Sequence, residues 1–153
     1  MKTVLFVMLC FIGAQSKIHT QADKKQLTTT RSITGMWSCT SKETVVESSG
    51  EEIPSWTFDL KLEVINNQIR GDYIVIFPDL RTDGNLYSPG EDSFDIRGKW
   101  NGDKYIVKYE SSRGANVIAY IKPITSRKIE WRIISVKGGC SFAPQRAILT
   151  RKR

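Results

Sequence analysis

Few residues in this sequence could support catalysis at a defined site. The single histidine, His19, lies near the N-terminus. A serine or cysteine nucleophile needs a base beside it, and a typical zinc site uses histidine or clustered cysteine ligands. The adjacent acids Glu51-Glu52 and Glu91-Asp92 lie in polar loops, whereas acid–base catalysis needs two carboxyls in different environments. We therefore expect no enzyme, no cofactor and no metal site, and a carboxylate-dependent hydrolase is the least favoured function.

The cysteines predict one covalent link. Cys39 and Cys140 follow the N-terminal region, and Cys10 lies within it. An even number of cysteines in an exported chain favours pairing. A Cys39–Cys140 bridge would close a loop of about 100 residues and stabilise the fold by on the order of 4 kcal/mol.

The N-terminus has the layout of a secretory signal peptide. Lys2 precedes the apolar run 4–13, and the small residues Ala14 and Ser16 follow it. This order of charge, apolar run and small residues is typical of a cleaved signal. We expect residues 1–16 to be removed, with a second cleavage position as late as Ala22, and the protein to be secreted or periplasmic.

The remaining chain is expected to be one domain. The chain has 153 residues and a net charge of +7, and no apolar run reaches the roughly 18 residues of a membrane span. Residues 17–30 are polar and aperiodic, which predicts a flexible lead-in to a domain over 31–153. The basic end Arg151-Lys152-Arg153 is compatible with an anionic partner, but a solvated tail is the favoured interpretation. Nucleic acid is not an expected partner, because no aromatic-basic RNA motif is present.

The domain shows the period of two that β-strands produce. From Trp56 to Val64 every second residue is apolar, which predicts a strand with one buried face. Asn66-Asn67 predicts a hairpin turn, because Asn tolerates positive φ. The same pattern predicts eight strands, near 31–39, 56–64, 69–77, 94–100, 105–110, 115–122, 129–133 and 147–149. Short antiparallel connections favour an all-β fold, either a sandwich or, as we predict, an eight-stranded antiparallel up-and-down barrel.

Short motifs resemble those of calycin barrels, the lipocalin and avidin families. Gly35-Met36-Trp37 resembles their Gly-x-Trp opening, and Gly71-Asp72-Tyr73 resembles an avidin-type strand. In lipocalins an Arg of the last strand covers that Trp, which implies a structural Trp37 under Arg151 or Arg146. The residues after Trp37 depart from the avidin pattern, so biotin binding is not implied.

Binding is therefore expected at loops rather than on strand faces. The connections Ser41–Ser55 and Pro78–Asp92 are the longest interruptions of the strand pattern, and in an up-and-down barrel they share one end. Tyr87 is the favoured contact, and Trp100, at the opposite end, is a weaker one. We expect an exported, non-enzymatic binding module for a protein or small molecule. Alternatives are a carrier that uses the barrel interior for a small apolar ligand, an inhibitor or immunity protein of a secreted enzyme, and an envelope protein without a discrete ligand.

Overall fold

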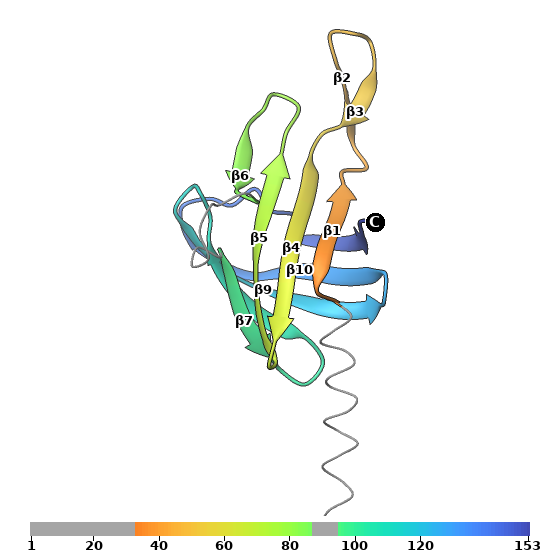
Figure 1. Cartoon of the computed structure of the whole chain (residues 1–153). Helices are drawn as coiled ribbons and strands as arrows, with labels where there is room; N and C mark the ends of the chain where they lie inside the picture. The colour runs from red at the N-terminus through yellow and green to blue at the C-terminus, as the bar shows by residue number, and fades with distance from the viewer. Residues whose placement is uncertain (1–32, 87–94) are drawn as a thin grey trace, which may run out of the picture.

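The computed structural model describes residues 33–86 and 95–153, which form a closed antiparallel β-barrel (Figure 1). Each barrel strand pairs with the one before it, and the last closes on the first, so the predicted eight-stranded up-and-down barrel is confirmed. None of the described segments contains a helix long and apolar enough to cross a bilayer. The barrel strands are β1 (Gly35–Thr40), β4 (Thr57–Ile65), β5 (Gln68–Ile76), β7 (Ile96–Trp100), β8 (Tyr105–Glu110), β9 (Ala115–Thr125), β10 (Lys128–Gly138) and β11 (Arg146–Arg151).

Three further short strands occupy the two connections that the sequence predicts as loops. β2 (Thr44–Val46) and β3 (Glu52–Pro54) pair with each other beyond the barrel. β6 (Thr82–Gly84) pairs with the end of β5. Both connections fold back as hairpins, which are too short to produce a detectable hydrophobic alternation. Figure 1 shows both hairpins projecting from the same end of the molecule.

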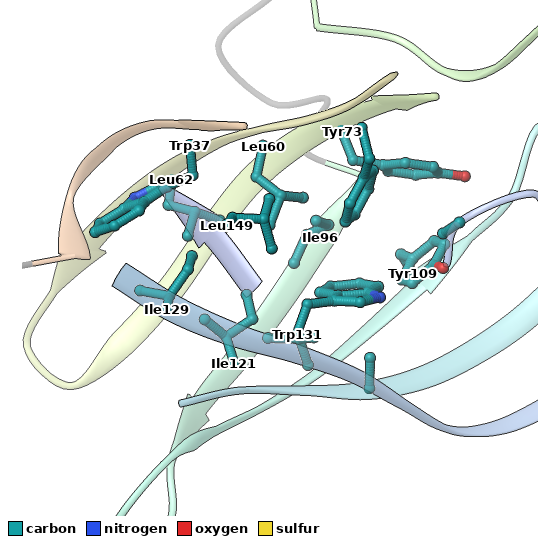
Figure 2. Close-up of a cluster of buried hydrophobic side chains, with 14 of the residues drawn as sticks. Trp37, Leu60, Leu62, Tyr73, Ile96, Tyr109, Ile121, Ile129, Trp131 and Leu149 are labelled. Atoms are coloured by element: carbon teal, nitrogen blue, oxygen red, sulfur yellow. The ribbon is translucent and has the colours of Figure 1, made fainter. Parts of the chain in front are cut away.

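Alternation along the strands determines which side chains fill the barrel. Phe58, Leu60 and Leu62 of β4 point inward and are buried, as their spacing predicts. Large inward side chains from the other strands meet them, including Trp37, Tyr73 and Trp131, each with 0% exposure. Figure 2 shows Trp37, Leu60, Leu62, Tyr73 and Trp131 pointing into the space between the strands. The outward face of β4 is not uniformly wet, because Asp59 is buried beneath Lys152, whose Nζ lies 2.7 Å from the carboxylate.

The barrel has two different ends. The tight turn Asn66-Asn67 has φ of 49° and 63°, as predicted, and it lies at one end with the 101–104 and 126–127 turns. At the other end lie the β2–β3 and β5–β6 hairpins, the 111–114 turn and the 139–145 loop. We call this second end the hairpin end. The long connections therefore share one end, as the strand order predicts.

β9 runs further than the sequence indicates. The strand predicted near 115–122 stops before Pro123, which is a poor residue for a strand interior, yet β9 continues to Thr125. On one side β9 pairs with β8 only as far as Ile121, opposite Tyr105. Among the described strands, Pro123 therefore has only β10 beside it, and a proline at such an edge removes no ladder hydrogen bond.

The predicted disulfide is absent, since Cys39 and Cys140 are both free thiols in the structure. Beside Cys39, Ser38 is level with Thr150 of β11, which pairs with Lys128 at the start of β10. Cys140 comes after the far end of β10. Cys39 lies opposite Phe58 of β4, whereas Cys140 lies opposite Gly114 at the start of the β9 region, so the two cysteines have different neighbours. Cys39 packs against the core while Cys140 is exposed, so their side chains do not meet.

Candidate binding surface

Trp37 and Arg151 form a packed layer at the end opposite the hairpins. The Trp37 indole donates to the Ile33 carbonyl at 2.8 Å, and the Arg151 guanidinium lies 4.4 Å from the ring centroid. Arg151 also donates to the Thr34 carbonyl at 2.7 Å. A Cβ at Gly35 would lie 2.9 Å from an Arg151 nitrogen, and Gly35 has a φ of 137°. The glycine of the Gly-x-Trp motif therefore makes room for the arginine.

The other residues singled out in the sequence lie apart from this layer. Arg146 begins β11 at the far end of that strand and pairs with Glu130 at 2.8 Å, so Arg151 is the arginine over Trp37. Trp100 ends β7 and packs edge-on against Tyr105, with ring centroids 4.8 Å apart. It lies at the end opposite the hairpins, as the topology predicts. Tyr87 lies outside the described residues.

Three turns at the hairpin end share one geometry. In each, the first residue's carbonyl accepts from the fourth residue's N–H, and its own N–H donates to the fifth residue's carbonyl. This is a three-residue hairpin loop whose last residue adopts a left-handed conformation, which favours glycine. The turns span 47–51, 77–81 and 111–115. Gly50 has φ +84° and Gly114 has φ +75°, but the equivalent residue of the middle turn is Leu80, with φ +63°.

Leu80 is therefore an apolar residue at a position whose backbone conformation favours glycine. It is 84% exposed, so packing within the barrel does not compensate its conformation. A left-handed L-residue costs roughly 1–2 kcal/mol. The turn is braced by Asp79, whose carboxylate lies 2.6 Å from Arg81 Nε. Strained residues of this kind concentrate at functional positions.

The neighbouring β2–β3 hairpin presents a second apolar element among acids. Val46 is 68% exposed and Val45 is 40% exposed. The base of the hairpin is fixed, because Ser41 donates its N–H to the Trp56 carbonyl at 2.9 Å. The segment 41–56 carries a single cation, Lys42, against the four carboxylates Glu43, Glu47, Glu51 and Glu52.

A buried carboxylate supports these loops from below. Asp83 of β6 is 0% exposed, and it accepts hydrogen bonds from three other segments. The donors are the Tyr73 hydroxyl at 3.0 Å, the Ser112 N–H and hydroxyl at 3.0 and 2.9 Å, the Ser141 hydroxyl at 3.3 Å and the Phe142 N–H at 2.8 Å. β6 is thereby tied to β5, to the 111–114 turn and to the 139–145 loop.

Aromatic and guanidinium groups continue this support toward the rim. Phe77 and Phe142 pack edge-to-face with centroids 5.3 Å apart. Arg81 lies 5.2 Å from the Phe77 ring and Arg113 lies 5.1 Å from the Phe142 ring. Such contacts contribute about 0.5–1 kcal/mol each at exposed sites. They hold the Leu80 turn against the rest of the barrel end.

Aromatic side chains of the described strands pack against one another inside the barrel at the hairpin end. Tyr73 and Tyr109 stack with centroids 4.7 Å apart, and Tyr109 and Trp131 with centroids 5.8 Å apart (Figure 2). Burial, together with the Asp83 charge, raises the pKa of both tyrosines above the ordinary value. Their hydroxyls stay protonated and bonded to Asp83 and Ser141. They act as packing and hydrogen-bonding groups.

Leu80 is not among the residues predicted from the sequence, although the sequence does contain a signal for it. Pro-Asp-Gly between two strands is a strong turn pattern, and this chain has Pro78-Asp79-Leu80 after a strand. A leucine replacing the expected glycine marks the position. Recognising it requires knowing that Phe77 and Arg81 pair across the turn.

Comparisons with protein-family profiles, curated proteins and solved structures give no match for this chain.

Proposed function

We propose that this protein is a non-enzymatic binding module that engages a protein partner through the tips of its two projecting hairpins. One observation carries the proposal: Leu80 is exposed in a left-handed conformation, whereas Gly50 and Gly114 fill the equivalent positions. The fold gains nothing from this leucine, and exposed apolar anchors are what protein partners bury. Val46 on the adjacent hairpin supplies a second anchor.

A protein partner fits the observations better than a small molecule inside the barrel. The inward side chains Trp37, Tyr73 and Trp131 are fully buried in one hydrophobic cluster. The four glutamates around Val46 favour a partner with a basic rim around an apolar pocket. Charges of this kind speed association and exclude wrong partners.

The proposal includes two features carried by the sequence. The N-terminal signal pattern supports export, so the partner is sought outside the cytoplasm. Gly35-Met36-Trp37 and the Arg151–Trp37 contact support a calycin-type relationship. Neither feature is needed for the hairpin tips to bind.

The test compares matched variants in affinity capture. Immobilised wild-type protein is incubated with secreted and envelope extract from its source, beside Leu80→Gly, Val46→Thr and Ile65→Thr. Ile65 is 47% exposed and ends β4 at the opposite end of the barrel, so Ile65→Thr is the control for Val46→Thr. We expect a partner kept by wild type and Ile65→Thr, with at least tenfold less recovered on the two hairpin variants. Equal recovery on all four proteins would overturn the proposal.

A further inference from the structure

A second surface lies on the outer wall of the barrel, away from the hairpin tips. It is a groove of about 460 Å³ across β7, β8, β9 and β10. Its volume is within the range of small-ligand pockets. Register places Arg97 opposite Lys108, Lys108 opposite Ile118, and Ile118 opposite Ser135. One row of side chains thus crosses the four strands.

The next row toward the hairpin end completes the groove. Asn116 of β9 lies opposite Lys137 of β10, and Asp95 lies just before β7. The lining therefore contains three cations, Arg97, Lys108 and Lys137, and one carboxylate. All three cationic residues are exposed.

The surrounding wall has the same sign of charge. Strands β7 to β10 contain only two acids, Glu110 and Glu130. Their further cations are Lys99, Lys122, Lys128 and Arg132. By contrast, β1, β4 and β5 contain more acids than bases. The field of the molecule therefore directs anions toward the grooved wall.

We propose that this groove binds an acidic saccharide, a sugar chain carrying sulfate or phosphate groups. The three cations match the anionic groups, and the polar groups of Asn116, Ser135 and Asp95 match sugar hydroxyls. Ile118 provides an apolar floor for the carbon face of a sugar ring. The lining aromatic, Tyr109, is only 5% exposed. Single-stranded nucleic acid binds by stacking bases on aromatic rings, so the groove fits a saccharide better.

The experiment measures affinity for a sulfated hexasaccharide by titration calorimetry. The variants Lys108→Gln and Lys137→Gln each remove one charge inside the groove. Lys128→Gln removes the same charge from the start of β10, and Lys128 does not line the groove. We expect each groove variant to bind at least fivefold more weakly and Lys128→Gln to bind within twofold of wild type. Equal weakening by all three variants would mean diffuse attraction and would overturn the proposal.

Other ligands separate the sources of the anion and the competing ligand classes. A phosphorylated hexasaccharide compared with the sulfated one shows which anion is preferred, and tight binding of either supports the proposal. Oligothymidylate of equal charge, bound as tightly as the saccharide, would overturn it in favour of nucleic acid. Inorganic sulfate that displaces the hexasaccharide at equal molar concentration would also overturn it, because the sugar would then contribute nothing. Leu80→Gly should leave this binding unchanged, so the two surfaces are tested separately.

Discussion

Leu80 is a residue whose type does not match its left-handed backbone conformation. Three turns at one barrel end have the same hydrogen-bond pattern, and two of them place glycine at the left-handed position. The third keeps an exposed leucine there. All three turns belong to the same molecule, so they share one fold and one solvent.

The first prediction follows from that comparison. Leu80→Gly removes roughly 1–2 kcal/mol of left-handed strain, and the greater freedom of glycine in the unfolded chain offsets about 0.5–1 kcal/mol of this gain. Stability in urea denaturation should therefore stay equal or rise by up to about 1.5 kcal/mol. A loss above 1 kcal/mol would show that Leu80 packs within the fold and is not a binding anchor.

A second prediction concerns Trp37, which is buried and bonded through its indole nitrogen. Trp37→Ala should destabilise the protein by about 3–5 kcal/mol, as large core truncations do. Arg151→Ala should cost less, about 0.5–2 kcal/mol, if the contact with the ring dominates. Chemical denaturation of both variants measures these losses. A change below 1 kcal/mol for Trp37→Ala would contradict its role in the core.

The two cysteines should differ in reactivity. Burial, and then the Asp59 charge, raises the pKa of the Cys39 thiol to about 11, so roughly one molecule in a thousand carries the thiolate at pH 8. Cys140 is exposed. In a Cys10→Ser variant, native protein should therefore lose one thiol quickly to iodoacetamide and the second only after unfolding, measured by intact mass. A mass that takes up no label without a reductant would restore the predicted disulfide.

At the scale of elements, Asp83 links the segments that form the hairpin end. Its carboxylate accepts from Tyr73, Ser112, Ser141 and Phe142, and hydrogen bonds to charged groups contribute about 1.5–3 kcal/mol each. Asp83→Asn places a donor where these groups also donate, so we expect a loss of at least about 2 kcal/mol. Amide hydrogen exchange should accelerate around Ser112 and Phe142 and stay unchanged in Asn66-Asn67. Unchanged protection at the hairpin end would contradict this role.

Some elements of this fold can be predicted from the sequence and others cannot. Long strands such as β4 are readable because one face is buried and the other is mostly polar over nine residues. The Asn66-Asn67 turn is readable because its residue types match its dihedral angles. The hairpins β2–β3 and β5–β6 are not, because three-residue strands leave too few alternations. Leu80 is recognised from the structure, because its turn has the same hydrogen bonds as the turns at Gly50 and Gly114.

Charge is distributed unevenly over the whole molecule, and no single segment of the sequence shows this. The β2–β3 hairpin is acidic and the wall of β7 to β10 is basic. The excess cations of the wall are spread over four strands, so the chain as a sequence suggests only a modest positive charge and a basic tail. The closure of the barrel places Arg97, Lys108 and Lys137 around one groove. The acidic β2–β3 hairpin and the basic wall of β7 to β10 can therefore bind different partners.

The last prediction uses the acid within that groove. Burial, followed by the charge of Asp72, raises the pKa of Asp95, and Asp83 adds to the effect. Asp95 is thus faced by Asp72 of β5 and Asp83 of β6, and it shares the groove with Arg97, Lys108 and Lys137.

As pH falls through a raised pKa, Asp95 takes up a proton and the groove loses its negative charge. Binding of a sulfated hexasaccharide, whose sulfates do not titrate at these pH values, should therefore tighten as the pH is lowered from neutral through the raised pKa of Asp95. Removing one like charge near the anion is worth roughly 0.5–1 kcal/mol in partly screened solvent, or about two- to fivefold. Asp95→Asn should bind with this tighter affinity already at neutral pH and show a flat profile. The same pH dependence in Asp95→Asn would assign the titration to another group, and His19→Asn, which removes the single histidine of the chain, distinguishes that case.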